Sequence, residues 1–351
     1  MHDDANRFLL PDWPRAYGGP SATGNIKSNP DDFIVEETLS FTPEGHGEHI
    51  FLYVEKVGEN TEYIARLLAR HAGVRQRDIG YAGLKDRHGR TRQWFSVWLP
   101  GKDAPDWQAI ESERLTILQA IRHPRKLKRG VLAGNRFVIL IRHWQGNRVQ
   151  TEHQLQCIQA TGFPNYFGEQ RFGHRGGNIE KALALFQGQR VKPEQRSIYL
   201  SAARSLLFND ILAARVTAQT WNQALSGDVF QLEGSHSHFL TDLIDAPLIE
   251  RVRISDIHPT GALWGRGSLR SSGDVATRER ACADAHPVLV TGLECADLSQ
   301  DRRALRVKPE NLSWHWSDDG LNLAFTLPAG SYATALLREI IVHSDLVGHS
   351  D

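Results

Sequence analysis

The feature that most limits the fold of this chain is a polar turn between two apolar stretches in residues 79–97. Apolar and aromatic side chains stand on both sides of the turn: Ile79, Tyr81 and Leu84 before it, and Trp94, Phe95 and Val97 after it. Gly83 and Gly89 bracket the turn and relax the backbone limits there. One carboxylate, Asp86, stands between the two glycines. The segment therefore predicts two strands joined by a loop that carries a single aspartate.

Basic residues surround Asp86 in the sequence: Lys85, Arg87, His88, Arg90 and Arg92. Because nearby positive charge favours the ionised carboxylate, we expect the pKa of Asp86 to lie below its ordinary value of about 3.9. Arginines also hold phosphates by forked hydrogen bonds, and aromatic side chains among cations suit stacked bases. Composition alone leaves an alternative, in which Asp86 only binds backbone amides in a solvated turn.

The composition is that of an ordinary globular protein. The chain has 351 residues, of which 40% are hydrophobic, and this length predicts about two domains. Its three cysteines, Cys157, Cys282 and Cys295, are far apart, which indicates neither a disulfide scaffold nor a zinc site. Because the N-terminus lacks the pattern of a signal peptide and no apolar run approaches about 20 residues, we expect a cytoplasmic protein that does not span a membrane.

Charge is distributed unevenly although the formal net charge is zero. Residues 1–60 contain four Lys and Arg against eleven Asp and Glu, a net charge of −7. Residues 61–130 contain fifteen Lys and Arg against seven Asp and Glu, a net charge of +8. A neutral total is therefore compatible with a basic face that binds nucleic acid.

Several other segments of the first half carry structural signals. Residues 49–57 have the composition of a strand, and Asn60 and Thr61 predict the start of a helix that ends at Gly73. His46 and His49 would be metal ligands only with further partners. The basic run 122–129 precedes a predicted strand at 137–141, where a rigid basic loop suits a phosphate clamp.

The second half alternates helical patterns with glycine-rich loops from about residue 151. Residues 197–209 predict entry into an amphipathic helix, and 261–274 predict an exposed loop. Near the C-terminus, the alternation in 321–327 predicts a half-buried strand, and 332–342 predict a helix.

The stretch AGLKDRHGRTRQWFS resembles the signature of the TruD family of tRNA pseudouridine synthases. Four further stretches resemble family motifs in the family's order: NIKSNPDDF, RKLKRGVLAGNRF, NYFGEQRFG and LPAGSYATALLRE. The resemblance implies an α+β fold. A pseudouridine synthase catalytic domain with a mixed, largely antiparallel sheet would comprise residues 1–158 and 308–351, and an inserted α/β TRUD domain would comprise residues 159–307.

The resemblance also implies a reaction, the isomerisation of uridine to pseudouridine at position 13 of tRNA. Asp86 would be the catalytic aspartate, tRNA would be the partner, and neither a cofactor, a metal nor a protein partner is implied. The residues expected to bind the substrate are Lys27, Phe33, Lys85, Arg87, Arg92, Asn135, Phe137, Arg171 and Tyr332. Tyr332 stands where the family often has phenylalanine.

Two alternatives remain open at the level of the sequence. A noncatalytic RNA-binding protein could use the same basic face. A glycoside hydrolase or nucleosidase would need a second carboxylate at a defined separation from Asp86.

Overall fold

The computed structural model describes residues 8–128, 130–241 and 243–345, which group into two compact units. Among these residues, one unit comprises 21–147, 309–330 and 341–345, and we call it the sheet unit. The other comprises 8–20, 148–308 and 331–340, and we call it the helical unit. Residues 8–20 and 331–340 thus cluster with the middle of the chain. The division into a catalytic and an inserted domain, with its boundaries at 158 and 307, stays a prediction.

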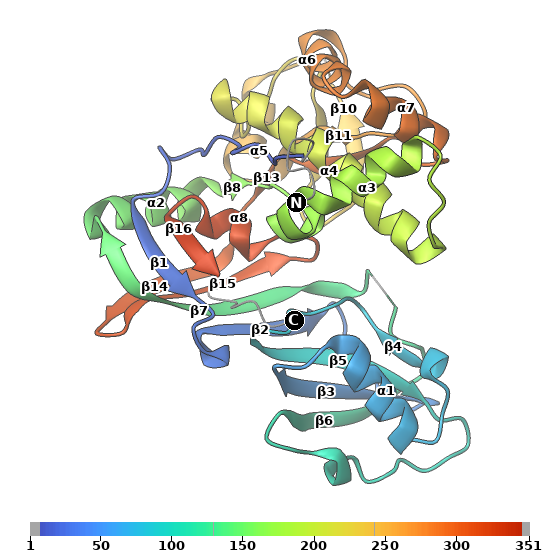
Figure 1. The fold of residues 1–351 in the computed structure, drawn as a ribbon. Helices are drawn as coiled ribbons and strands as arrows, with labels where there is room; N and C mark the ends of the chain where they lie inside the picture. Colours follow the sequence, from blue (N-terminus) through green and yellow to red (C-terminus); the bar gives the residue numbers. More distant parts are fainter. Residues whose placement is uncertain (1–7, 129, 242, 346–351) are drawn as a thin grey trace, which may run out of the picture. The chain divides into compact units, whose positions relative to one another are not determined.

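The sheet unit is built on ten strands within the described residues, in the central order β14-β15-β7-β2-β5-β3-β6 (Figure 1). The bounds are β1 Ala22–Ile26, β2 Phe33–Leu39, β3 His49–Val57, β4 Ile79–Tyr81, β5 Arg90–Trp98, β6 Leu115–His123, β7 Leu132–Gly146, β14 Glu310–Ser317, β15 Gly320–Pro328 and β16 Ile341–Asp345. The pairs β1–β16 and β2–β5 are parallel, while the long pairs β2–β7, β3–β5 and β7–β15 are antiparallel. The predicted mixed, largely antiparallel sheet is confirmed.

Helix α1, Thr61–His71, covers one face of this sheet (Figure 1). It begins after Asn60, as predicted, and its buried Ile64 and Leu68 pack in one cluster with Leu52 of β3. Phe51, the residue before Leu52 in β3, belongs to a second apolar cluster with Trp94 and Leu127. Because successive side chains of a strand point to opposite faces, each face of the sheet carries its own core.

In the helical unit, helices surround a small sheet. The helices are α2 Arg148–Thr161, α3 Gly177–Phe186, α4 Pro193–Thr217, α5 Ala246–Arg253, α6 Gly273–Asp284, α7 Pro287–Cys295 and α8 Ala333–Leu337. The strands β9 Val229–Leu232, β10 His238–Leu240, β11 Ile257–Leu263 and β12 Asp301–Ala304 form one sheet, and β8 Phe163–Pro164 pairs with β13 Arg306–Val307. Helix α4 confirms the predicted helix at 197–209, and its Leu206, Leu207 and Leu212 are fully buried.

Short 3-10 helices complete the secondary structure of the described residues. They cover Pro30–Asp32, Gln76–Asp78, Trp107–Ile110, Glu169–Phe172 and His174–Gly176.

Two expectations from the sequence are wrong. The helix expected at 332–342 ends at Leu337, and Ile341 begins β16, which pairs with β1 at Ala22. The β-branched pair Ile341 and Val342 suits a strand better than the last turn of a helix. The loop expected at 261–274 begins inside β11, where Gly261 lies against the side chains of Leu305 and Phe208.

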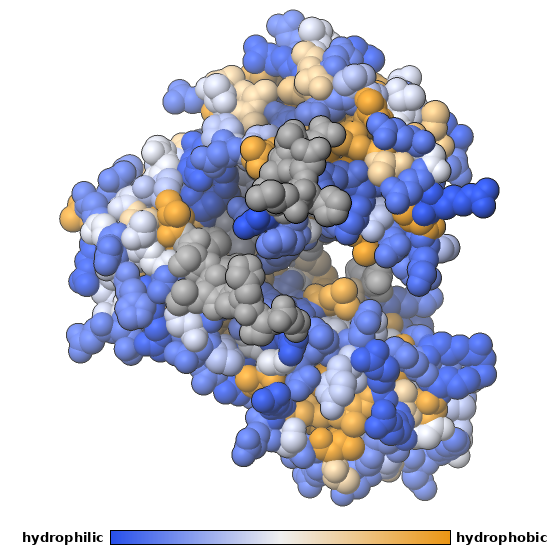
Figure 2. All heavy atoms as spheres, viewed as in Figure 1, coloured by the Kyte–Doolittle hydropathy of each residue, from blue (hydrophilic) through white to orange (hydrophobic). Residues whose placement is uncertain are grey.

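Hydrophilic residues cover most of the face drawn in Figure 2, and hydrophobic residues appear there in small groups. Small exposed apolar groups are normal on a folded protein. Within the described residues, no helix combines the length and the apolar character that crossing a membrane requires.

Candidate active site

Asp86 lies in an anchored loop between β4 and β5. The two strands pair antiparallel, with Tyr81 opposite Phe95, so the predicted strand–loop–strand is confirmed. At the base of the loop, the buried Gln93 donates from Nε2 to the Gly83 carbonyl at 2.6 Å. The amide of Lys85 donates to Thr61 Oγ1 of α1 at 3.0 Å. The loop is therefore tied both to its own strand and to the helix that covers the sheet.

The Asp86 carboxylate has two donors. Lys27 Nζ lies 2.6 Å from Oδ2, and the backbone amide of His88 donates to Oδ1 at 3.0 Å. Burial pushes the pKa of Asp86 up, but the charge and hydrogen bond of Lys27 and the His88 amide outweigh it, so the pKa lies below its ordinary value. This direction confirms the prediction. Because the side chain is still 25% exposed, the ionised carboxylate remains open to a substrate.

The cation on Asp86 is Lys27, at the end of β1, and not one of the arginines beside it in the sequence. Those arginines have other partners: Arg87 donates to the Gly58 carbonyl, Arg90 pairs with Asp31 and Glu55, and Arg92 pairs with Glu36 and Glu55. The expected source of the low pKa is therefore corrected in part: Lys27 lowers it most, and His88 is the member of the expected cation cluster that also contributes. Contact of Arg87 and Arg92 with substrate stays a prediction.

Lys27 occupies an unusual backbone conformation. Its φ is 59°, in the left-handed region that most non-glycine residues avoid at a cost of roughly 1–2 kcal/mol. Its side chain is 4% exposed, and its ammonium lies 4.7 Å from the centroid of the Phe33 ring. A Cβ at Gly89 would lie 2.5 Å from the Phe33 carbonyl oxygen, so the end of the Asp86 loop requires glycine there. The strained lysine, the loop and Phe33 thus form one packed group.

Lys56 of β3 is a second cation of this group, and the sequence reasoning missed it. Its ammonium donates to the Glu59 carbonyl at 2.7 Å and to the Asp86 carbonyl at 3.3 Å. Burial lowers the pKa of Lys56 to about 8, although the charge of Asp86 opposes this. The available signal was a lysine near the end of the largely apolar and aromatic strand 49–57, directly after Glu55.

Lys85 links Glu37 of β2 to the candidate residue Asn135 of the neighbouring strand β7. Its ammonium lies 2.8 Å from Glu37 Oε1 and 2.7 Å from Asn135 Oδ1, and Glu37 stands opposite Asn135 in the β2–β7 register. The Glu37 side chain is fully buried and also accepts from the Trp94 amide at 2.9 Å. Burial raises the pKa of Glu37, while Lys85 acts against this. Because Lys85 holds the Asn135 oxygen, the amide nitrogen of Asn135 is left to face a ligand as a donor.

Phe33 and Phe137 belong to a row of aromatic rings. Their centroids are 6.3 Å apart, and Phe137 stacks on Phe325 at 5.4 Å. Both Phe33 and Phe137 are buried, so their packing alone explains their presence. A role in holding a base stays a prediction.

The helical unit holds the other two predicted residues, and it brings them together. Arg171 donates to the Tyr332 hydroxyl from Nε at 3.0 Å and from Nη2 at 2.6 Å. A Cβ at Gly168 would lie 3.1 Å from the Tyr332 ring, so glycine allows this ring to approach the backbone. Arg303, which the sequence reasoning missed, lies over the Phe167 ring at 4.1 Å. Arg303 stands in the stretch before Val307, where the family resemblance is weaker.

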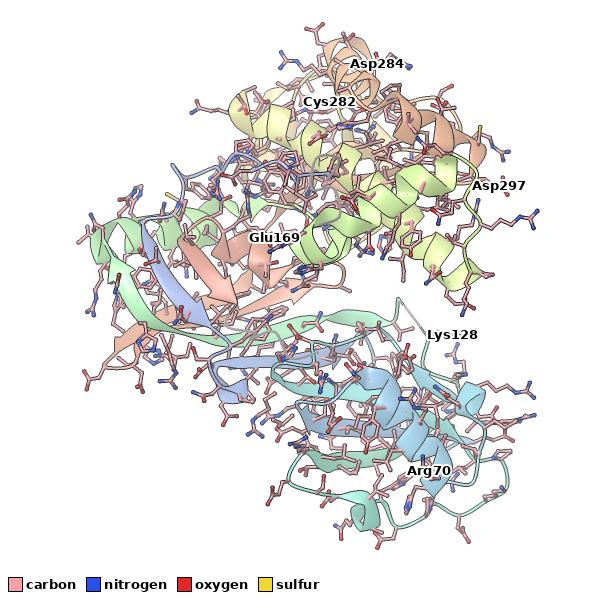
Figure 3. The ribbon with its side chains drawn as sticks, in the orientation of Figure 1. Arg70, Lys128, Glu169, Cys282, Asp284 and Asp297 are labelled. Atoms are coloured by element: carbon pink, nitrogen blue, oxygen red, sulfur yellow. The ribbon has the colours of Figure 1, made fainter. Side chains whose placement is uncertain are left out.

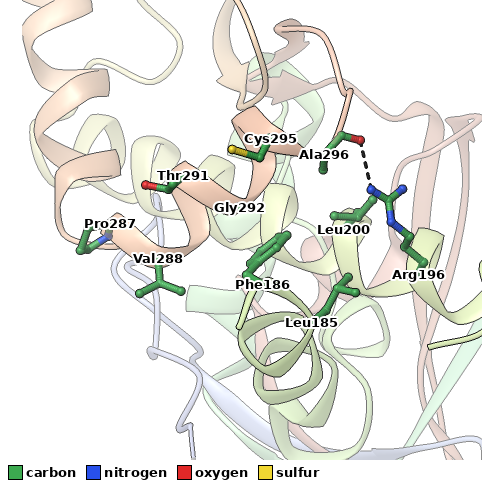
Figure 4. Close-up of a pocket in the computed structure, with 10 residues that line it drawn as sticks. All are labelled: Leu185, Phe186, Arg196, Leu200, Pro287, Val288, Thr291, Gly292, Cys295 and Ala296. Atoms are coloured by element: carbon green, nitrogen blue, oxygen red, sulfur yellow. Dashed lines mark hydrogen bonds between the residues drawn. The ribbon is translucent and has the colours of Figure 1, made fainter. Parts of the chain in front are cut away.

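A groove of about 600 Å³ lies elsewhere in the helical unit, between α3, α4 and α7 (Figure 4). Apolar side chains such as Phe186 and Leu200 form most of its lining. Its charged residue, Arg196, donates to the Ala296 carbonyl at 3.3 Å. Because its ten lining residues include no carboxylate and no histidine, this groove does not offer the acid–base chemistry of the Asp86 site.

Metal binding finds no support in residues 8–128, 130–241 and 243–345. Over these ranges, no three His, Cys, Asp or Glu side chains are grouped so that they could hold a metal ion. His46 is one of the two histidines considered from the sequence, and its Nε2 lies 3.5 Å from Glu44 Oε2.

Comparisons with known proteins agree on one family. A family model described as tRNA pseudouridine synthase D (TruD) matches residues 15–188 and 174–340. A protein of Hydrogenovibrio crunogenus named tRNA pseudouridine synthase D is 49% identical over 338 residues, which cover 95% of this chain and 97% of that protein. A protein of Methylococcus capsulatus with the same name is 48% identical over 343 residues, which cover 97% of this chain and 96% of that protein. A crystal structure from Methanosarcina mazei, named as a candidate member of the same family, superposes with a TM-score of 0.68 at 22% identity and covers 95% of each chain, which supports the same fold. The chain belongs to the tRNA pseudouridine synthase D (TruD) family.

Proposed function

We propose that this protein isomerises uridine to pseudouridine at position 13 of tRNA, with Asp86 as the catalytic carboxylate. The observation that carries the proposal is the ionised, partly exposed Asp86 held by Lys27 in a chain of the TruD family. Relatives with nearly half their residues identical are named for this reaction. A tRNA substrate also favours a cytoplasmic location.

The reaction breaks the bond between N1 of uracil and C1′ of the ribose, turns the base, and joins C5 to C1′. The proton on C5 is then lost to water, and the ring nitrogen that left C1′ takes up a proton from water, so the product is an isomer of uridine. Asp86 would begin the reaction either as a nucleophile, at the ribose or at the uracil, or as the general base that starts glycosidic cleavage. Each route requires the ionised carboxylate that Lys27 stabilises. No electron enters or leaves, because one glycosidic bond replaces another within the same nucleotide.

The base must leave its stack before it reaches Asp86, since these enzymes act on atoms that a folded RNA covers. Phe33 and Phe137 would bound the pocket for the flipped base. The Asn135 amide, oriented by Lys85, would donate to a uracil carbonyl. In this proposal Lys27 holds Asp86, Tyr332 contributes an aromatic face, and Arg87, Arg92 and Arg171 bind phosphates.

The burial of Glu37 argues against the glycosidase alternative. A hydrolase of this kind needs a second carboxyl group that reaches the substrate as an acid. Glu37, whose pKa is raised, is linked to the site through Lys85, but its side chain is fully buried and accepts from a backbone amide. It therefore supports the loop and cannot act as a proton donor to a substrate.

The proposal is tested with tRNA transcripts labelled with tritium at C5 of uracil. We expect tritium release from a transcript with uridine at position 13, and no release when the label is confined to transcripts that carry cytidine there. Mapping the product should place pseudouridine at that position. Binding of both transcripts without tritium release from either would contradict the proposed enzymatic activity and favour a noncatalytic RNA-binding protein.

A further inference from the structure

A second groove lies in the sheet unit, at the turn between β6 and β7. It has a volume of about 610 Å³. Its lining is Phe41, Thr42, Glu44, His123, Arg125, Lys126, Leu127, Lys128 and Val131. We call it the Phe41 groove. Within the described residues, none of these side chains is among the partners of Asp86 given above.

The floor of the Phe41 groove is apolar and fixed. Phe41 stacks on the ring of His123, with centroids 4.9 Å apart and planes inclined by 27°. Leu127 is buried in the apolar cluster on the face of the sheet opposite α1, and its amide donates to Ser96 Oγ at 3.0 Å. A Cβ at Gly47 would lie 2.5 Å from Pro124, so the turn is also packed closely against the segment before β3. A nucleobase would meet a preformed aromatic and aliphatic surface.

His123 lines the groove, and one nitrogen of its ring is buried without a hydrogen bond from any described part of the chain. Its side chain is 6% exposed, and among residues that the structure describes no group forms a hydrogen bond with Nδ1. The nearest carboxylate oxygen, Glu44 Oε1, lies 3.9 Å away, which is too long for a hydrogen bond. Because this nitrogen is buried, His123 serves the groove through the face of its ring, which stacks on Phe41.

The rim of the groove carries positive charge. Arg125 and Lys128 are exposed, and the ammonium of Lys126 is held by the Arg77 carbonyl at 2.5 Å. Glu44 is the acidic residue of the lining. Figure 3 shows Lys128 in the segment that leads into β7 and Arg70 on α1. Two exposed cations beside an aromatic floor complement a phosphate joined to a base.

We propose that the Phe41 groove binds one nucleotide of the tRNA other than the target uridine. The base lies against Phe41, which His123 supports from behind by stacking, and Arg125 and Lys128 contact the phosphates. The choice of tRNA as the ligand rests on the proposed function.

The first test removes the two cations. We compare wild-type protein, the double variant Arg125→Gln/Lys128→Gln and a control, Arg66→Gln/Arg70→Gln, which removes two exposed charges from α1 of the same unit. The dissociation constant for the tRNA transcript is measured at several salt concentrations by filter binding. We expect the groove variant to bind at least about tenfold more weakly, with a salt slope smaller by about 1.4–1.8 for two lost phosphate contacts, and the control to keep the wild-type slope. Equal slopes for both double variants would overturn the proposal.

The second test addresses the aromatic floor. Phe41→Leu keeps an apolar side chain but removes the ring, while Phe41→Tyr keeps the ring. We expect about tenfold weaker tRNA binding for the leucine variant and nearly unchanged binding for the tyrosine variant, because base stacking requires the aromatic face. Thermal unfolding of each variant verifies folding. Equal affinity of the two variants, both folded, would contradict the groove as a base-binding site.

Tritium release separates the two proposals. The groove variants should raise KM for tRNA more than they change kcat, because, in the part of the chain that the structure describes, the lining residues are not among the partners of Asp86 given above. If wild-type protein forms pseudouridine and the groove variants bind tRNA as it does, the groove proposal fails while the proposed function stands. If wild-type protein forms no pseudouridine, the proposed function fails, and the salt slopes still decide whether the groove binds RNA.

Discussion

Replacing Lys27 by methionine tests how the site keeps Asp86 ionised. Methionine is unbranched like lysine and one atom shorter, so it keeps most of the aliphatic stem at the same left-handed backbone position. It cannot donate to Asp86 Oδ2, which Lys27 reaches at 2.6 Å. Burial, which raises the pKa of Asp86, would remain after the substitution. The lost interaction should therefore appear as a higher pKa of this one carboxylate.

The size of the effect follows from the kind of bond that is removed. A hydrogen bond to a charged group contributes about 1.5–3 kcal/mol. At about 1.36 kcal/mol per pH unit, losing it moves the acid limb of the activity profile upward by about one to two pH units. Lys27→Arg keeps the positive charge and should move the limb much less.

The assay is tritium release from C5-labelled tRNA as a function of pH, analysed as kcat/KM because this ratio reports the free enzyme. Between about pH 4 and 5, the methionine variant should lose activity that the wild type and the arginine variant keep. An acid limb at the same pH in all three proteins would refute the role of Lys27, and so would a loss of activity that is independent of pH.

Two further predictions concern the helical unit. Burial raises the pKa of Glu339 from 4.5 to about 7, so the folded protein holds a proton that the unfolded chain releases in this window, and stability falls as the pH rises through it. Glu339→Gln should remove this pH dependence and raise the free energy of unfolding at pH 8 by up to about 3 kcal/mol in urea titrations, and an unchanged pH dependence would contradict the argument. Tyr332→Phe should retain most activity because it keeps the ring, but should lower stability by about 1–3 kcal/mol because two Arg171 donors lose their acceptor. Tyr332→Ala should weaken activity at least about tenfold in the same tritium assay, and equal activity of the two variants would exclude stacking on this ring.

Local patterns predicted those parts of the fold that depend on short-range physics. The strand 49–57 and the start of α1 after Asn60 follow from composition and capping, and both have the predicted bounds. Local patterns did not predict where the C-terminal helix ends. Ile341 lies in a strand because it pairs with β1, which is more than three hundred positions earlier in the chain.

The candidate site shows the same limit more sharply. The sequence identified Asp86 and the sign of its pKa shift, since clustered cations favour a carboxylate. It assigned that effect to the cations beside Asp86 in the sequence. Of these His88 does contribute, whereas Arg90 and Arg92 are paired with carboxylates on other strands. Counting charges along a chain cannot show which pairs form, and the ammonium that reaches Asp86 comes from a strand 59 positions away.

The central claim is that the ionised carboxylate of Asp86 performs the isomerisation. The most direct measurement is single-turnover tritium release by Asp86→Asn, with the tRNA fully bound. Asparagine keeps the shape of the side chain and an oxygen for the His88 amide, but it carries no negative charge. The account predicts tRNA binding by this variant with no release above the enzyme-free background. Release at a rate near that of the wild type would contradict it.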